Sequence, residues 1–320
     1  MNNLRFTLLA IFSLIGQISF AQTNVTNFGD GSGTTGSHAA YFGLNAGRLA
    51  TGMSNTFMGI NSGYNTTTGG YNTFMGQATG YINTTGSNNT FVGHWSGNRN
   101  TTGNNNTAFG YRTARRNTTG AGNSFFGYMS GHENTTGSNN LFLGFQAGYK
   151  NKTGLKNVFI GYQAGYNESG SNKLYIENSN NLTTPLIYGD FSANGVGINT
   201  NQLSDGGTNY TLSVNGKVRA NEVKVYTGWA DYVFEKGYQL RSLEQVEAHI
   251  NKNGHLPDVP SAKVVEKNGI FVGEMHATLL RKIEELTLYM IESNKATKAL
   301  QKEVATLKKE NQALKAKLQK

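Results

Sequence analysis

The sequence contains no cysteine and only three prolines, and charged side chains make up 15% of its 320 residues. The absence of cysteine excludes disulfide bonds, thiol nucleophiles, thiolate zinc sites and lipid anchors attached to cysteine. The shortage of proline excludes collagen-like and proline-rich linker architectures. Charged residues usually make up about 25% of a globular chain, so this chain is poor in charge as well.

Glycine and aromatic residues are abundant instead, with 41 Gly, 17 Phe and 16 Tyr. This aromatic content is too high for a disordered polar chain. A chain that is rich in glycine and aromatics but poor in charge is typical of a repeated architecture.

The N-terminus has the pattern of a signal peptide. Arg5 precedes an apolar run from Phe6 to Phe20, and Ser19-Phe20-Ala21 fits the small-x-small cleavage rule. We predict a signal peptide over residues 1–21 and export of the mature chain. The run is too short for a comfortable membrane span, and no later segment approaches one.

A unit of 17 residues recurs eight times between residues 35 and 170. Each copy contains a Thr-Gly pair, whose glycines are Gly36, Gly52, Gly69, Gly86, Gly103, Gly120, Gly137 and Gly154. A second glycine column runs in step: Gly43, Gly59, Gly76, Gly93, Gly110, Gly127, Gly144 and Gly161. We predict that each unit forms one coil of a β-solenoid or β-roll, with two short strands separated by glycine bends. The glycines supply positive φ angles or close approaches at the corners.

Three further columns share the same phase. Stacked asparagines predict a hydrogen-bonded ladder: Asn55, Asn72, Asn89, Asn106, Asn123, Asn140 and Asn157. An apolar column follows: Phe57, Phe74, Phe91, Ala108, Phe125, Phe142 and Phe159. Its neighbour is also apolar: Met58, Met75, Val92, Phe109, Phe126, Leu143 and Ile160. Neighbouring strand residues point to opposite faces, so one column fills the interior and the other faces outward. An outward apolar stripe invites aggregation unless it is covered, and we therefore expect a homo-oligomer.

The unit Asn-(Thr/Ser)-apolar-apolar-Gly-x-x-(Ala/Ser)-Gly, as in Asn55–Gly63 and, with Leu141 at the second position, in Asn140–Gly148, resembles the head repeats of trimeric autotransporter adhesins. The resemblance covers about residues 35–170 and implies a left-handed β-roll in which three chains pack side by side. The unit here is longer than is usual in that family. The chain also lacks that family's C-terminal membrane β-barrel, so the resemblance supports trimeric packing but not self-anchoring.

The repeat has other possible interpretations. A calcium-binding roll needs an Asp in each turn, but Glu133 and Glu168 are the only acidic residues between Thr34 and Gly170. An ice-binding solenoid is suggested by paired threonines that begin at Thr67, Thr84, Thr101, Thr118 and Thr135. Glycosylation sequons begin at Asn83, Asn100, Asn117 and Asn134, although these asparagines are more simply turn residues. Sugar stacking is suggested by tyrosines that we expect to be exposed: Tyr64, Tyr81, Tyr149 and Tyr166.

The pattern stops at Ser171, and we divide the mature chain into four parts. Residues 22–181 form the repeat region with its caps. Residues 182–228 form a β-rich neck, with a turn at Asp205-Gly-Gly and a hairpin at Asn215-Gly216. Residues 229–273 form a small α/β segment whose helix, around Leu243–Ile250, ends before His255-Leu-Pro-Asp-Val-Pro-Ser. Residues 274–320 form a coiled coil.

Residues 229–273 resemble the C-terminal region of tail-fibre-like surface proteins of Bacteroidetes-type bacteria, including the intramolecular-chaperone group of phage tail spikes. Self-cleaving members use a Ser nucleophile and a Lys partner in a Ser-Asp-x-Arg-Leu-Lys-type motif. The equivalent stretch here, which begins at Trp229, has neither residue, and Ser261 and Lys263 lie in an unrelated context. The protease activity is not carried over.

Apolar residues follow a heptad from Leu279 to Leu318: Leu279, Ile283, Leu286, Met290, Leu300, Val304, Leu307, Leu314 and Leu318. With Ile283 at position a, Glu303 and Glu310 fall at g, and Lys308 and Lys315 fall at e. This favours parallel chains in register. Ile or Val at a with Leu at d favours a dimer, whereas the roll resemblance favours a trimer, which we adopt.

Neither metal-ligand spacing nor a catalytic constellation is present. The histidines His38, His94, His132, His249, His255 and His276 are too scattered for a metal site. The net charge of +9 is concentrated near the C-terminus, where residues 295–320 hold eight lysines and two glutamates, a pattern typical of a solvated helix surface. We expect no catalytic, cofactor-binding or metal residues, and no nucleic acid partner.

Together these patterns predict a mainly β fold and a secreted, homotrimeric, structural or adhesive protein of the bacterial surface. Surface glycans are candidate partners. The alternatives are a phage-tail-fibre-like module with a chaperone role and a glycan- or ice-binding solenoid.

Overall fold

A computed structural model describes residues 26–229 and 231–318, which divide after Val218 into two compact units. The predicted signal peptide lies outside the described residues.

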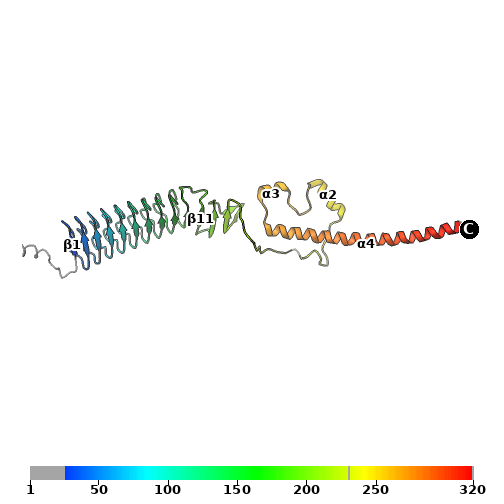
Figure 1. Ribbon diagram of the computed structural model, residues 1–320, viewed down its shortest axis with the longest axis horizontal. Helices are drawn as coiled ribbons and strands as arrows, with labels where there is room; N and C mark the ends of the chain where they lie inside the picture. The colour runs from blue at the N-terminus through cyan, green and yellow to red at the C-terminus, as the bar shows by residue number, and fades with distance from the viewer. Residues whose placement is uncertain (1–25, 230, 319–320) are drawn as a thin grey trace, which may run out of the picture. The chain divides into compact units, whose positions relative to one another are not determined.

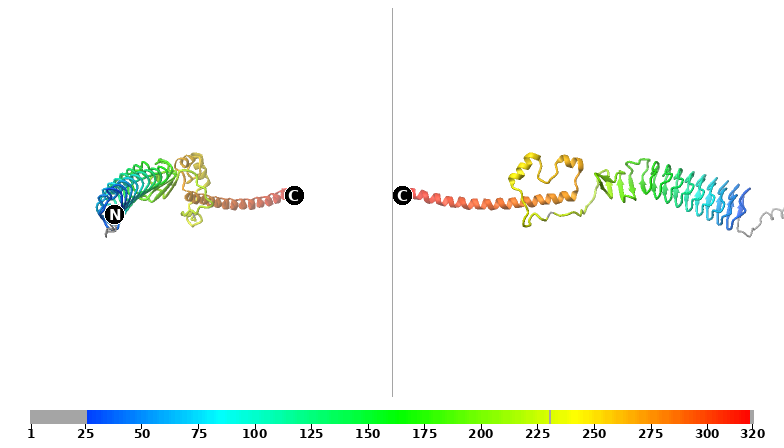
Figure 2. Two further views of the ribbon diagram at one scale, coloured as in Figure 1. Left: turned by 60° about the vertical axis from the view of Figure 1, so that its left-hand side comes forward. Right: turned by 180° about the vertical axis from the view of Figure 1, so that it is seen from behind.

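The first unit is a β-solenoid in which each coil contributes one short strand to a parallel stack (Figure 1). The parallel strands are β1 (Thr26–Phe28), β2 (Ala40–Phe42), β3 (Thr56–Met58), β4 (Thr73–Met75), β5 (Thr90–Val92), β6 (Thr107–Phe109), β7 (Ser124–Phe126), β8 (Leu141–Leu143), β9 (Val158–Ile160) and β10 (Lys173–Ile176). The view from behind shows the same regular stack (Figure 2). The 17-residue solenoid is confirmed: β2–β9 are the eight predicted copies, and β1 and β10 flank them.

The expectation of two strands in each coil was wrong. The side of the coil that follows the second glycine is a series of turns, because backbone angles there enter the left-handed region, as at Asn61 (φ 57°) and Gly63 (φ 59°). Turns of successive coils still bond to each other, as where the Gly63 amide donates to the Thr79 carbonyl at 2.9 Å. The coils are therefore hydrogen-bonded on both sides although only one side is a strand.

The interior is filled by the first apolar column, as expected. The rings of Phe57, Phe74 and Phe91 are fully buried and stack at centroid distances of 4.8 and 5.0 Å. Burying one such ring contributes about 1.5–3 kcal/mol. A third glycine column makes room for the rings, since a Cβ on Gly63 would lie 2.5 Å from the Phe57 ring.

One coil departs from this rule at both positions together. Ala108 replaces the phenylalanine, and Ala114 replaces the glycine that would contact it. Both alanines are buried, and Ala114 keeps the left-handed φ of 49°. The smaller side chain at position 108 leaves room for the Cβ of Ala114, so the two replacements compensate for each other.

The stack is closed by a short β-rich cap. Strand β10 pairs antiparallel with β11 (Ile187–Asp190), which pairs antiparallel with β12 (Gly195–Ile198), and β12 pairs in parallel with β15 (Leu212–Val214). A hairpin joins β13 (Ser204–Asp205) to β14 (Thr208–Asn209) through Gly206 (φ 54°) and Gly207 (φ 87°), which confirms the predicted turn.

The hairpin predicted at Asn215-Gly216 was wrong. Residues 217–226 form no strand, and β15 takes β12 as its partner. The Asn215 side-chain amide instead donates to the Asn199 backbone carbonyl at 3.2 Å, and the Asn199 side-chain amide donates to the Asn215 backbone carbonyl at 3.1 Å. A long-range pairing thus outcompetes the local turn signal.

The second unit contains α2 (Leu243–Asn253), α3 (Ala262–Asn268) and α4 (Val272–Leu318), and α2 and α3 lie along the N-terminal half of α4 (Figure 1). The predicted helix around Leu243–Ile250 is confirmed as α2. Ser242 and Gln245 form a capping box at its start, and Gly254 (φ 74°) ends it.

The described residues between 229 and 273 contain no strand, so the expected α/β mixture is in fact helix and loop, and α3 was not anticipated. Two of their tyrosines bond to side chains of α4. The Tyr238 hydroxyl donates to the Glu285 carboxylate, and Arg281 donates to the Tyr232 hydroxyl.

Candidate interaction surfaces

The second apolar column points outward from the solenoid, as the strand alternation requires. We call it the outer stripe: Phe42, Met58, Met75, Val92, Phe109, Phe126, Leu143 and Ile160. Met58 and Leu143 are 43% and 46% exposed, whereas the neighbouring Phe57 and Phe142 are fully buried. Each coil therefore buries one apolar side chain in the core and exposes the next one on the outside.

A second exposed column runs beside the outer stripe, and the sequence reading missed it. It lies one residue after the second glycine and is aromatic in four successive coils: Tyr111, Tyr128, Phe145 and Tyr162. Their rings stack along the solenoid axis at centroid distances of 5.3, 5.0 and 5.3 Å. The repeat alignment contained the signal, since Leu44 and Ile60 hold the same position in earlier coils. The outward apolar surface is thus broader than one stripe.

Buried asparagine ladders bond successive coils of the solenoid to one another. The Asn72 backbone amide donates to the Asn55 side-chain oxygen at 2.9 Å, and its side-chain amide donates to the same oxygen at 3.1 Å and to the Gly86 carbonyl at 2.9 Å. The bond from backbone amide to preceding asparagine recurs from coil to coil through Asn157. Because these amides are buried and bonded, they position the coils without themselves being a binding site.

The sequon asparagines form a second internal ladder. All four asparagines are buried: Asn83, Asn100, Asn117 and Asn134. The side-chain amides of Asn100, Asn117 and Asn134 each donate to the side-chain oxygen of the preceding asparagine at 2.7 Å. Burial keeps them from a glycosyl donor in the folded chain. The expectation that they are turn residues identified their place but not the ladder.

The threonine and tyrosine columns also make contacts between successive coils, along the solenoid axis. The hydroxyls of Thr67, Thr84, Thr101, Thr118 and Thr135 donate to the next coil's carbonyl at 2.9–3.0 Å. The tyrosines expected to be exposed are only half-exposed, because Tyr64 stacks on Tyr81 at 5.2 Å and Tyr149 on Tyr166 at 5.0 Å. Their ring faces are therefore largely taken by each other.

Helix α4 exposes its heptad residues along its whole length. Ile283 is 60% exposed, Leu300 60% and Leu314 60%. The predicted helix is confirmed, and it begins at Val272, slightly before the expected boundary. An apolar stripe of this length on one helix is the surface that a coiled-coil partner covers.

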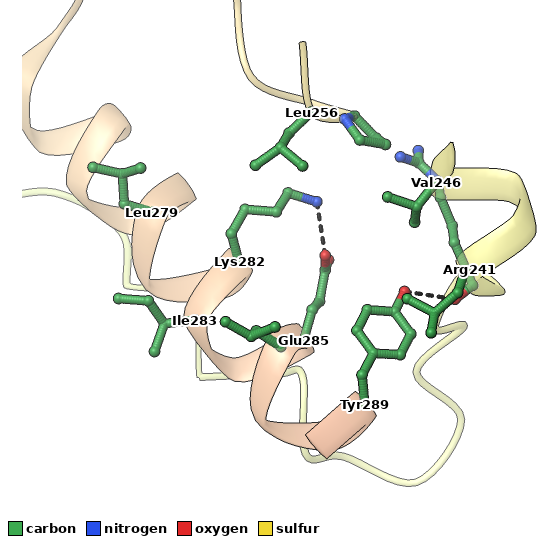
Figure 3. A pocket seen from close by; sticks show the side chains of 11 residues that line it. Arg241, Val246, Leu256, Leu279, Lys282, Ile283, Glu285 and Tyr289 are labelled. Atoms are coloured by element: carbon green, nitrogen blue, oxygen red, sulfur yellow. Dashed lines mark hydrogen bonds and ion pairs between the residues drawn. The ribbon is translucent and has the colours of Figure 1, made fainter. Parts of the chain in front are cut away.

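The N-terminal part of this apolar stripe on α4 also lines one side of an apolar pocket (Figure 3). The pocket measures about 430 Å³ and is lined mainly by Leu243, Val246, Leu256, Leu279, Ile283 and Leu286. At its rim, Lys282 bonds to Glu285 at 2.8 Å, and the Tyr289 hydroxyl donates to the Arg241 carbonyl at 2.6 Å (Figure 3). The pocket is thus a gap between α2, its following loop and α4 at positions that a heptad partner would contact.

A charge network around Asp258 holds this loop against α4. Asp258 accepts from Arg241 at 3.2 Å and from Lys282 at 3.2 Å. Burial opposes ionisation, but these two bonds outweigh it and hold the pKa of Asp258 below its usual range. Burial, together with the bond to Glu285, raises the pKa of Tyr238 to about 12.

Ser261 and three of the histidines have positions that the structure explains by capping or packing. Ser261 caps α3, where its hydroxyl accepts from the Val264 amide at 3.4 Å. His249 and His255 meet edge to face at 5.5 Å, and His132 is buried and stacks on Tyr149 at 5.0 Å. Within residues 26–229 and 231–318, no three His, Asp or Glu side chains are placed to hold a metal ion.

No protein-family model, curated protein or solved structure matches this chain. None of the helices in the described part of the chain has both the length and the apolar character needed to cross a membrane. The fold therefore defines the class: a β-solenoid protein with a 17-residue repeat and a long C-terminal helix.

Proposed function

We propose that this chain is a secreted fibrous protein of the bacterial cell surface, with a structural or adhesive role, that assembles as a parallel homotrimer. One observation supports the assembly above all: among the residues that the structure describes, each of the two units exposes a long apolar surface. In the solenoid it is the outer stripe, and in α4 it is the heptad.

A second copy of the same chain is the occupant that suits both surfaces. The outer stripe repeats at every coil, so an identical solenoid in register offers a matching surface along its length. The α4 pocket is continuous with the heptad, and a neighbouring α4 would place its Leu279 and Ile283 positions against it. The resemblance to trimeric adhesin head repeats favours three chains over two.

The proposed role is structural rather than catalytic, because the two asparagine ladders of the solenoid bond successive coils to one another along the axis. Export rests on the predicted signal peptide.

A tail-fibre-like module with a chaperone role is the second candidate, favoured by the resemblance of residues 229–273. A glycan- or ice-binding solenoid is the third. Ice binding is the less favoured of these two, since the threonine hydroxyls already donate to neighbouring coils.

The proposal is tested by expressing the tagged chain in a Bacteroidetes-type host. We expect an N-terminus at Gln22, sensitivity to protease added to intact cells, and a three-chain species after chemical crosslinking. An unprocessed chain retained inside the cell would contradict the proposal. Cleavage near residues 225–235, seen in the intact mass, would favour the tail-fibre module instead.

A further inference from the structure

Four arginines gather on the turn side of two successive coils. Arg99 belongs to the coil of β5, and Arg112, Arg115 and Arg116 belong to the coil of β6. The guanidinium groups of Arg112 and Arg115 each lie 4.6 Å from the Trp95 ring centroid. We call these four residues the arginine cluster.

The positive charge of the arginine cluster is poorly compensated. Among the described residues, only Arg116 of the four has a carboxylate partner, Glu133, at 3.0 Å. The Nε atoms of Arg112 and Arg115 are buried and have no hydrogen-bond acceptor. Burial lowers the pKa of Arg115, and the charges of Arg112, Arg99 and Arg116 lower it further.

His132, in the next coil, adds a second sign of unmet polar groups. It is 5% exposed, and neither ring nitrogen has a hydrogen-bond partner. It occupies the same position in its coil as Arg115 does in the preceding one. Buried polar groups without partners cost free energy, so this face carries unpaired polar groups as well as uncompensated positive charge.

The groups of the cluster that remain free to bind a ligand are the N–H edges of its guanidinium groups. Two guanidinium groups lie over the Trp95 ring, and Tyr111 stacks on Tyr128 at 5.3 Å. Nucleobases need free ring faces on which to stack, and here those faces are occupied. An arginine that is stacked on a ring still presents its N–H edge, which binds carboxylate or sulfate groups bidentately.

The spacing suits a polymer better than a small ion. Arg99 and Arg116 hold the same position in adjacent coils, so their backbones are about one strand spacing, ~4.8 Å, apart. Both side chains are exposed. Arg99 and Arg116 thus place two cations one coil apart, and Glu133, which pairs with Arg116, follows them in the next coil. Two cations at this interval match a ligand that carries successive negative groups at a similar spacing.

We propose that the arginine cluster binds an acidic polysaccharide through its carboxylate or sulfate groups. The choice of an extracellular polymer rests on the proposed surface function, whereas the binding site itself does not depend on the oligomeric state.

The test measures binding of purified residues 22–320 to immobilised heparin, polygalacturonate and neutral dextran at physiological salt. We expect binding to one or both acidic polymers and none to dextran. The double variant Arg99→Gln/Arg115→Gln should bind at least about tenfold more weakly, because it removes two charge-assisted contacts. Arg115→Lys should bind with intermediate affinity, since it keeps the charge but loses the fork.

Arg48→Gln is the matched control, because Arg48 has the same position in its coil as Arg115 but lies outside the cluster, bonded to Tyr64 at 2.9 Å. It should bind as the unaltered chain does. Arg99→Gln alone alters only an exposed side chain and should still weaken binding if the double variant fails to fold.

Three results would overturn the inference: no binding to either acidic polymer, equal weakening by Arg48→Gln, or tighter binding to single-stranded DNA that the same variants abolish. A monomeric chain that binds would refute the trimer and leave this inference standing. A trimer at the cell surface that does not bind acidic polymers would refute this inference and leave the proposed function standing.

Discussion

The two units of this chain differ in how far they bury their own apolar side chains. The solenoid completes its core within one chain, because each phenylalanine ring rests on the rings of adjacent coils and each ladder asparagine bonds to its neighbours. Helix α4 keeps its heptad residues at the surface, with Met290 67% exposed. A repeat stacked on itself needs no partner to fold, whereas a single amphipathic helix gains most of its stability from packing against another surface.

The sharpest way to break this comparison is to disable the helix alone. Leu300→Asp with Leu307→Asp places two carboxylates in the proposed heptad core, and we expect loss of the coiled-coil contact. The thermal unfolding of the solenoid should change little. Sedimentation velocity measures assembly, and the unfolding of the β signal in circular dichroism measures the solenoid. Lys302→Gln with Lys309→Gln, at the outward f positions of the same heptads, serves as the control and should still assemble.

The second prediction compares two neighbouring residues of β8. Phe142→Ala removes a buried ring that stacks at 5.0 and 4.6 Å on the rings of Phe125 and Phe159. We expect a loss of about 3–5 kcal/mol in solenoid stability, read from denaturant unfolding. Leu143→Ala, on the outward side of the same strand, should cost clearly less at concentrations where the chains are separate. Equal losses would mean that the inward and outward columns do not differ as described.

The third prediction concerns the exceptional coil. Ala108→Phe alone should destabilise the solenoid by about 1–3 kcal/mol, since the ring meets the Cβ of Ala114. Adding Ala114→Gly should recover most of that loss, because it restores the combination found in the other coils. A double-mutant cycle measures this coupling, and additive effects would show that the two alanines are independent.

The smallest expected effect is a pH dependence within the solenoid. Burial lowers the pKa of His132, and Arg115 and Arg116 lower it further, while Glu133 opposes them. A depressed folded-state pKa contributes stability that is present above the unfolded pKa of about 6.5 and is lost as the pH falls.

We therefore expect the melting temperature of the solenoid to fall between pH 7.5 and pH 5. The melting temperature of His132→Tyr should fall less over the same range, because the variant lacks the imidazole. Tyrosine fits this column, since Tyr149 and Tyr166 occupy it in the following coils. An identical fall in both proteins would assign the effect to other groups.

The repeat could be predicted from the sequence because its constraints are strict at each position. A Cβ at Gly63 would collide with Phe57, and the buried Asn72 amide has fixed partners, so few substitutions are tolerated and the columns stay visible. The turn side of the coil was not predictable in the same way. Its left-handed angles fall on residues such as Asn61 and Gln146, which carry no unique signal.

Long-range choices also escaped the sequence. Asn215-Gly216 has the local chemistry of a hairpin, but β15 gains more by pairing with β12. Helix α3 is only seven residues long, and its start depends on the Ser261 cap rather than on an apolar period. The arginine cluster became visible only when the coils brought Trp95 next to Arg112 and Arg115.

The central claim is that the exposed apolar surfaces of both units are covered by identical chains. Multi-angle light scattering on purified residues 22–320, over a range of concentrations, tests it most directly. The account predicts a mass of three chains. A monomer that persists at the highest concentration would contradict it, and the outer stripe would then have to be the binding face for a different molecule.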